Sequence, residues 1–163
     1  MNPLLHRIQQ LLKDKLEVNA DMEDDQLHFS GRCGPVTSRI RITADESLLT
    51  VMGHFPVFAS TSKRAAACET VVLINWGLSV AHFSLDTDGE IVCIAQMVLF
   101  DGTPTDRQLA RLIHRVWSCL EFYAESLIAI LTAGADPALT IARAEKLRTE
   151  SRRQVAAPDL SVN

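Results

Sequence analysis

Residues 36–55, VTSRIRITADESLLTVMGHF, contain two strand-like stretches joined by a short polar connection. In the first stretch one side of an extended chain would carry Val36, Ser38, Ile40 and Ile42, and the other side Thr37, Arg39, Arg41 and Thr43. Such alternation is typical of a strand with one buried and one solvated face. The connection Ala44-Asp45-Glu46 leads directly into the second stretch, Leu48 to Phe55, so the two strands are predicted to pair antiparallel.

Further strands are predicted on both sides of this pair. Residues 27–33 alternate less regularly and end at Gly34-Pro35, a turn signal. Two later runs, at about 79–85 and 90–100, flank Asp86-Thr87-Asp88-Gly89, and Asp-Gly between apolar runs is a strong hairpin signal. The sequence therefore predicts a sheet of five strands.

Helical spacing of apolar residues appears in four segments. They are residues 3–17, residues 61–75, a long segment from Thr103 to about Ala133, and a weaker one from Asp136-Pro137 to about Arg153. The long helix is predicted to begin with Thr103 as its cap and Pro104 in its first position. The acidic segment Asp21–Asp25 is predicted to be a solvated connector.

The order of elements indicates an α+β fold: helix, three antiparallel strands, helix, two-strand hairpin, long helix and a C-terminal helix. Residues 1–134 are predicted to form a single domain, with residues 135–153 as an appended helix and residues 154–163 as a disordered tail. If the sheet face away from the helices is apolar, it should require a partner.

Composition excludes several classes of protein. The chain has 163 residues, 47% hydrophobic and 22% charged, which is the composition of a folded globular protein. Its net charge of −4 argues against a dedicated nucleic-acid binder. It contains neither an apolar run of membrane-spanning length nor a secretory leader, so a soluble, cytoplasmic protein is expected. The four cysteines, at 33, 68, 93 and 119, are far apart and are expected to be buried and reduced.

The sequence contains no complete motif for catalysis or metal binding. The segment from Asp86 to Glu90 has the start of a calcium loop but Met97 at the twelfth position, where a glutamate is needed. Gly31-Arg32-Cys33-Gly34 matches the GxxG of nucleotide-binding domains but falls between strands, so it is read as a turn. His114 and Cys119 lie about 140° apart on one helix and cannot pair. No catalytic residue, cofactor or metal ligand is expected, and therefore no enzyme.

A family resemblance rests on several short motifs. They are Asn75-Trp76-Gly77-Leu78, Phe83-Ser84-Leu85-Asp86, the Asp88-Gly89 turn, Thr105 to Leu109, Phe122-Tyr123, and Leu127 to Gly134. Over about residues 65–134 the chain resembles the YbjN family of bacterial sensory transduction regulators. Ala124 departs from the family, which often has proline there, so the helix should remain unkinked. The resemblance implies a type III secretion chaperone-like fold and a protein-binding or regulatory role without catalysis, often in dimers.

Phe122 is an apolar residue that does not belong to the apolar stripe of the predicted long helix. On a helical wheel the apolar stripe centres near Leu109, Val116, Leu120 and Leu127, whereas Phe122 falls almost opposite. Three arrangements remain open: the C-terminal helix covers the ring with Leu139 or Leu147, a second subunit covers it, or the ring is exposed. The expected partner-binding residues are Phe122, Trp117, Arg111, Arg115 and Glu125.

Three functions remain open from the sequence. A chaperone-like or regulatory protein-binding module is favoured, with a protein client of unknown identity and a homodimer as the expected assembly. The alternatives are a small enzyme with an unrecognised site and a purely structural homodimer subunit. Neither nucleic acid nor a membrane is expected as a partner.

Overall fold

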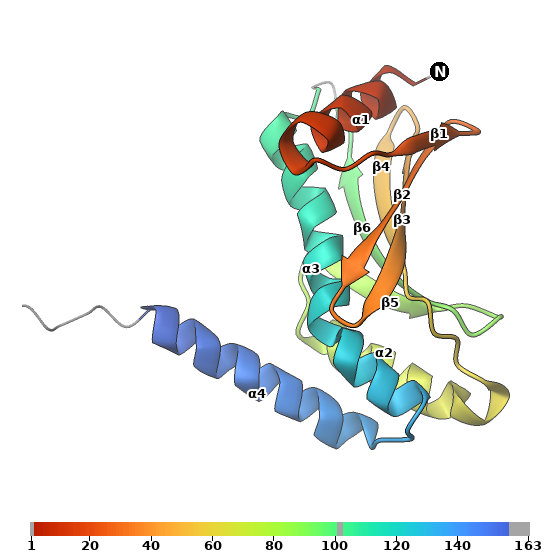
Figure 1. The fold of residues 1–163 in the computed structure, drawn as a ribbon, viewed down its shortest axis with the longest axis vertical. Helices are drawn as coiled ribbons and strands as arrows, with labels where there is room; N and C mark the ends of the chain where they lie inside the picture. Colours follow the sequence, from red (N-terminus) through yellow and green to blue (C-terminus); the bar gives the residue numbers. More distant parts are fainter. Residues whose placement is uncertain (1, 101–102, 157–163) are drawn as a thin grey trace, which may run out of the picture.

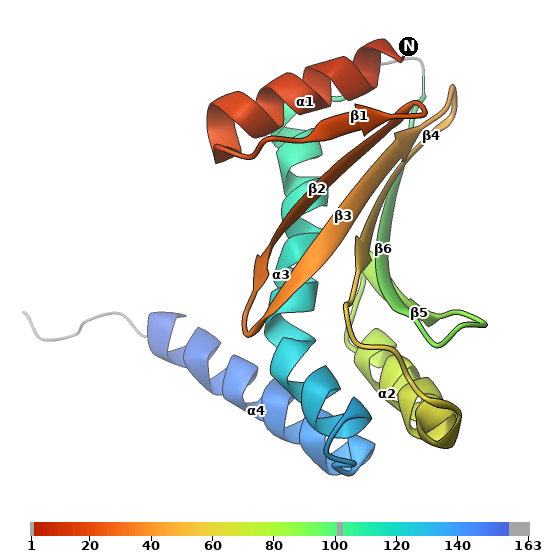
Figure 2. The ribbon, with the colours of Figure 1, turned by 45° about the vertical axis from the view of Figure 1, so that its right-hand side comes forward.

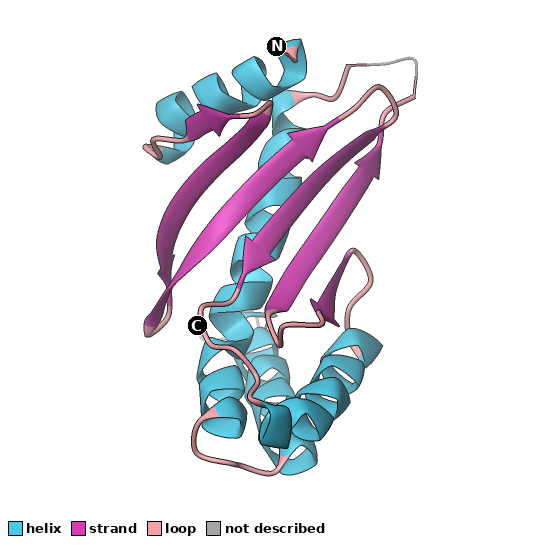
Figure 3. Cartoon of the chain, turned by 90° about the vertical axis from the view of Figure 1, so that its right-hand side faces the viewer, coloured by secondary structure: helices cyan, strands magenta, loops and turns pink. Residues whose placement is uncertain are grey.

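Helices gather on one side of an antiparallel sheet in the computed structural model, which describes residues 2–100 and 103–156 (Figure 1). No described helix covers the opposite sheet face (Figure 3). The helices are α1 (Pro3–Leu16), α2 (Arg64–Trp76), α3 (Asp106–Leu131) and α4 (Pro137–Ala156), with a 3₁₀ turn η1 (Thr61–Lys63) before α2. The strands are β1 (Asp21–Glu23), β2 (Gln26–Cys33), β3 (Val36–Ala44), β4 (Leu48–His54), β5 (Ala81–Leu85) and β6 (Ile91–Val98). The predicted α+β class is confirmed, and the order of elements agrees with the prediction except for one additional strand, β1.

The sheet has the order β1-β2-β3-β4-β6-β5, with every neighbouring pair antiparallel. The predicted hairpin forms, with β5 as the edge strand and β6 paired to β4. Its turn is held by the Asp86 carboxylate, which accepts hydrogen bonds from the backbone N–H groups of Asp88 and Glu90. Gly89 supplies the left-handed conformation that closes the turn, with φ of 89°.

The prediction that Asp21–Asp25 is a solvated connector is wrong for its first three residues. Asp21–Glu23 form β1, so the sheet has six strands rather than five. Met22 lies opposite Leu27, and the two flanking acids face solvent. Asp24 and Asp25 both have positive φ, 47° and 55°, as in the two-residue turn whose twist matches a hairpin. A strand with one inward residue is too short to leave a periodic pattern in the sequence.

Helix α3 lies along the inner face of the sheet and supplies much of the core. Leu109, Val116, Leu120 and Leu127 are fully buried, as the helical wheel predicts. The helix approaches β4 closely at Gly53. A Cβ atom there would lie 2.3 Å from Leu120 Cδ1 and 2.7 Å from Val116 Cγ1, so glycine is required for this packing.

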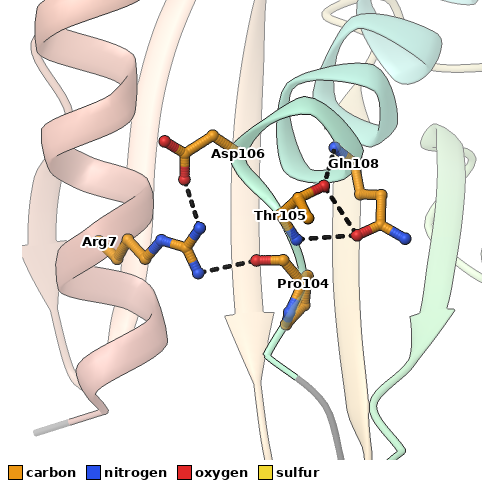
Figure 4. Close-up of polar contacts among 5 residues, drawn as sticks. All are labelled: Arg7, Pro104, Thr105, Asp106 and Gln108. Atoms are coloured by element: carbon orange, nitrogen blue, oxygen red, sulfur yellow. Dashed lines mark hydrogen bonds and ion pairs between the residues drawn. The ribbon is translucent and has the colours of Figure 1, made fainter.

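Helix α3 begins two residues later than predicted. Thr105, and not Thr103, is the N-cap: its hydroxyl accepts from the Gln108 N–H, and the Gln108 side chain accepts from the Thr105 N–H (Figure 4). This reciprocal capping box satisfies two of the backbone donors at the start of the helix. Arg7 of α1 donates to the Pro104 carbonyl at 2.7 Å and pairs with Asp106, so the start of α3 is also tied to α1 (Figure 4).

Helix α4 packs on α2 and α3 rather than on the sheet (Figure 2). It extends to Ala156, so residues 154–156 of the predicted disordered tail belong to the helix. The rest of that tail, residues 157–163, lies outside the described residues. None of the described helices is long and apolar enough to cross a membrane.

Candidate partner-binding surface

Phe122 is half-buried, and α4 is the element that covers it. The Arg148 guanidinium lies over the ring, 4.9 Å from its centroid, and the Tyr123 ring packs edge-on at 4.6 Å. The expected covering residues, Leu139 and Leu147, are 75% and 56% exposed. Of the three arrangements that the sequence left open, the structure has the first, with the C-terminal helix folded back over Phe122, and the residue observed over the ring is Arg148. A cation over an aromatic face provides the contact instead.

Tyr123, next along α3, anchors the same helix from the core side. Its ring is fully buried, and its hydroxyl donates a hydrogen bond to the Glu145 carboxylate of α4. Burial, followed by this hydrogen bond, raises the pKa of Tyr123 well above its ordinary value. Glu145 also lies 3.8 Å from Arg148, so these three side chains form one polar contact between α3 and α4.

Trp117 belongs to a different surface. Its ring stacks on Phe29 of β2, with centroids 6.3 Å apart, and lies so close to Gly31 that an added Cβ atom would be 2.0 Å from the indole. Trp117 and Phe29 line a hollow of about 270 Å³ between α1, β2 and α3. The other lining residues are Leu12, Leu16, Val18, Ile113 and His114. We call this the apolar hollow.

Arg111 and Arg115 lie on a third surface. Both are exposed and line a hollow of about 520 Å³ together with His114 and Ser118 of α3 and Arg148 of α4. The Ser118 hydroxyl lies 3.1 Å from His114 Nε2. We call this the arginine hollow.

The five predicted partner residues therefore do not form one site. Trp117 lines the apolar hollow, Arg111 and Arg115 line the arginine hollow, and Phe122 lies beneath Arg148. Glu125 is exposed and lines neither hollow. The helical wheel placed these residues correctly around α3, but it carried no information on where β2 and α4 would meet that helix.

The edges of the sheet are protected against pairing with another strand. At one edge β1 has three residues, two of them acidic and exposed. At the other edge Asn75 of α2 hydrogen-bonds both backbone groups of Phe83 in β5, donating to its carbonyl at 2.9 Å and accepting from its N–H at 2.7 Å. Short, charged and covered edges disfavour strand addition. Side-chain surfaces are thus the better candidates for binding.

No described helix covers the outer sheet face (Figure 3). The residues of β2 and β3 that face outward are polar. Across this face, His28 of β2 lies opposite Arg41 of β3, and Arg41 lies opposite Met52 of β4. In the neighbouring row, Ser30 of β2 lies opposite Arg39 of β3. His54 on this face is buried and contacts Glu90 through Nδ1 at 3.1 Å. The face therefore lacks the continuous apolar surface that would require a partner.

Cys93 of β6 and Cys119 of α3 form a pair that the sequence did not indicate. Both are buried, and their side chains are hydrogen-bonded to each other. Cys33 is buried as well, whereas Cys68 is exposed, so the expectation of burial is wrong for Cys68. The hydrogen bond within the pair raises the pKa of Cys93 and lowers the pKa of Cys119, which Arg115 and Arg148 lower further. The pair joins residues of two elements far apart in the chain, so no spacing rule could have found it. His114 contacts Ser118 and not Cys119, in agreement with the helical geometry.

Among the residues that the structure describes, no three histidine, cysteine, aspartate or glutamate side chains group in a way that could hold a metal ion. The apolar hollow contains one ionisable side chain, His114. The arginine hollow contains donors but no carboxylate or thiol. The Ser118 hydroxyl of the arginine hollow contacts the His114 imidazole, but no carboxylate among the lining residues orients that ring, as a catalytic triad would require.

The chain is similar to known proteins over most of its length. A family model described as "YbjN: Putative bacterial sensory transduction regulator" matches residues 7–128. Among solved structures, the fold is similar to that of YbjN from E. coli, described as a putative transcription regulator, with a TM-score of 0.57 and 14% identity. This similarity covers 76% of this chain and 93% of the E. coli YbjN chain. At such low identity it shows similarity of the fold alone. No curated protein matches the chain.

Proposed function

The chain belongs to the YbjN family, and from this premise we propose that it is a regulator without catalytic activity that acts by binding another protein. The family is described as one of sensory transduction regulators, and the solved relative as a transcription regulator. A protein can regulate transcription through another protein, so this proposal requires no contact with nucleic acid. The proposed setting is the cytoplasm, where the four free cysteines would stay reduced.

The observation that carries the proposal is the apolar hollow. Its walls come from α1, β2 and α3, and they are aliphatic and aromatic except for His114. Leu16 at its rim is 45% exposed although it belongs to the apolar stripe of α1. Aromatic and aliphatic side chains gathered around a pocket are typical of binding hot spots. A partner segment would insert one or two apolar side chains beside Trp117.

Crosslinking in the cell tests this proposal. A photoreactive amino acid is placed at Leu16, and a control at Thr37, which is exposed on the outer face of β3. The expected result is a discrete adduct with one protein from position 16 and none of the same mass from position 37. Identical adducts from both positions, or none from position 16, would contradict the proposal.

Fluorescence of the purified proteins provides a second test. The chain has two tryptophans, so Trp76→Phe leaves Trp117 as the only indole. Adding the crosslinked partner should shift Trp117 emission to shorter wavelength, because an inserted apolar side chain excludes water from the hollow. Unchanged emission at saturating partner would place the interface elsewhere.

A homodimer is the second candidate assembly, and a different surface favours it. Val72 and Trp76 lie one turn apart on α2, Val80 follows shortly after, and all three are exposed, Trp76 by 95%. A tryptophan so exposed is a common anchor of protein interfaces. We therefore propose this patch, rather than Phe122, as the surface for self-association.

A further inference from the structure

Three arginines follow one another at four-residue intervals on the exposed side of α3: Arg107, Arg111 and Arg115. Like charges at this spacing repel and weaken a helix. Among the described residues, no carboxylate forms an ion pair with Arg111 or Arg115. The whole chain is acidic, with a net charge of −4, so the basic stripe is not a consequence of composition.

The second half of this stripe opens into the arginine hollow. All five lining side chains, Arg111, His114, Arg115, Ser118 and Arg148, can donate hydrogen bonds, and none is a carboxylate. They come from two helices that are distant in sequence and meet only in the folded chain. A concave surface lined only by potential donors is suited to an anion with several oxygen atoms.

Arg148 is already held in place at this hollow. Its guanidinium lies over the Phe122 ring, and Nη1 is 3.8 Å from Glu145 Oε1, leaving 23% of the side chain exposed. The Glu145 carboxylate is engaged by the Tyr123 hydroxyl. A guanidinium fixed before binding loses less conformational freedom when the ligand arrives. The His114–Ser118 contact orients a second pair of donors.

The positive potential also acts on a neighbouring buried group. The pKa of Cys119 is lowered, first by its hydrogen bond with Cys93 and then by the charges of Arg115 and Arg148. Two of the three guanidinium groups of the hollow therefore influence the same point on α3, independently of any ligand.

From these observations we propose that the arginine hollow binds a phosphate monoester group. A phosphate group carries a charge near −2 and three acceptor oxygens, which match two exposed guanidinium groups and a hydroxyl. The volume of about 520 Å³ exceeds that of the phosphate group alone, so part of the bearing molecule also enters. The bearer is either a small metabolite or a phosphorylated side chain. The site does not depend on the protein-binding role proposed above.

Titration of the purified full chain tests the proposal. Inorganic phosphate is added at constant ionic strength against chloride while backbone amide resonances are recorded. Phosphate should shift resonances around residues 111–118 and 148, and chloride should not. Equal shifts with both anions, or phosphate shifts outside these residues, would overturn the proposal, because general screening and not a site would then explain the changes.

Matched variants locate the site. Arg115→Gln and Arg111→Gln should each weaken phosphate binding about tenfold or more, as loss of a charge-assisted hydrogen bond does. Arg107→Gln removes the same charge from the same helix outside the hollow and should change binding less than twofold. All three side chains are exposed, so the variants should fold. Equal weakening in Arg107→Gln and Arg115→Gln would overturn the proposal.

Two further ligands distinguish the source of the phosphate group. A serine-containing peptide with and without phosphorylation represents a modified side chain, and a sugar phosphate represents a metabolite. Binding of either phosphorylated form at residues 111–118, with none of its unphosphorylated match, supports the proposal and identifies the bearer. Equal binding of the matched forms would contradict it.

Discussion

At the scale of single residues, Tyr123 connects three elements. Its ring packs edge-on against Phe83 of β5 at 5.7 Å and against Phe122 of its own helix, and its hydroxyl binds Glu145 of α4. A buried hydroxyl needs such a partner, because an unpaired polar group in the core is costly. The sequence shows Tyr123 as one more apolar position of α3, and only the folded chain supplies Glu145.

The first prediction concerns alkaline pH. The folded-state pKa of Tyr123 is raised above its ordinary value of 10.0, first by burial and then by Glu145. The folded state therefore holds this proton more tightly than the unfolded state. The resulting stability is complete below the unfolded pKa of about 10 and is lost as the pH rises above it.

The chain has one tyrosine, so the change in near-ultraviolet absorbance that accompanies tyrosinate formation reports Tyr123 alone. Tyrosinate should appear only as the protein unfolds at alkaline pH, and Tyr123→Phe should reduce the loss of stability above pH 10. Tyrosinate absorbance rising near pH 10 while circular dichroism remains native would contradict this prediction.

The second prediction concerns Gly31, which lies beneath the Trp117 ring. Gly31→Ala would place a Cβ atom 2.0 Å from Trp117 Cη2, so it should lower the free energy of unfolding by about 1 to 3 kcal/mol through overpacking. Urea denaturation measures the change. Gly77→Ala is the matched control, because its nearest neighbour would be 3.6 Å away, at ordinary contact distance.

A double-mutant cycle separates this clash from loss of glycine's backbone freedom. Trp117→Phe removes the atoms that a Cβ would meet, so Gly31→Ala should cost less in that background than in the wild type. The same cost in both backgrounds would show that Trp117 is not the obstacle.

At the scale of elements, the two terminal helices are attached by different means. Helix α1 buries Leu5, Ile8 and Leu12 completely in the core. Helix α4 packs on α2 and α3 with only Pro137 and Ile141 buried among its described side chains, and its polar contacts with α3 are Glu145 on Tyr123 and Arg148 on Phe122. Because burial of apolar area dominates packing energies, α4 should separate from the fold more easily than α1.

The third prediction tests this weaker attachment. Phe122→Ala removes the aromatic face under Arg148, which should weaken docking of α4 by about 1 to 2 kcal/mol. Trypsin should then cleave at Arg143 and Lys146 about tenfold faster while the rest of the chain stays folded.

Phe58→Ala serves as the control, because Phe58 is an exposed phenylalanine outside the contacts of α4. It should leave the cleavage rate of α4 unchanged. A loss of global stability in Phe122→Ala with α4 still protected would mean that Phe122 supports the core rather than α4.

At the scale of the whole molecule, surfaces of different chemistry adjoin one another around α3. The outward-facing residues of β2 and β3 are polar, the apolar hollow lies between α1, β2 and α3, and the arginine hollow lies between α3 and α4. The patch of Val72, Trp76 and Val80 lies at the end of α2. His114 lines both hollows, and Val80 lines a further hollow with Arg115 and Arg148, so molecules bound at these surfaces would be neighbours.

The fourth prediction concerns self-association through that patch. Trp76→Glu should convert dimers to monomers, because a charge at the centre of an apolar interface is left without a partner. Melting of the monomer should be unchanged, since Trp76 is 95% exposed. Sedimentation at several concentrations measures the mass. A wild-type protein that remains monomeric at high concentration would exclude the dimer.

The sequence alone was sufficient for the fold class because its signals are local. Alternation in residues 36–43, the Asp88-Gly89 turn and the long apolar stripe of α3 each depend on neighbours within a few positions. Local sterics and burial of one face act on these segments wherever they are placed, so their types and order follow directly. The family resemblance was visible for the same reason, since its motifs are short and contiguous.

Only the tertiary structure decided which side chains meet. Arg148 on Phe122, Cys93 beside Cys119, and Trp117 above Gly31 each join segments separated by at least 26 residues. Such contacts depend on the position of whole elements, which is set by packing of the complete core rather than by any local pattern. The same reason explains why β1 was missed, because its three residues become a strand only when β2 lies beside them.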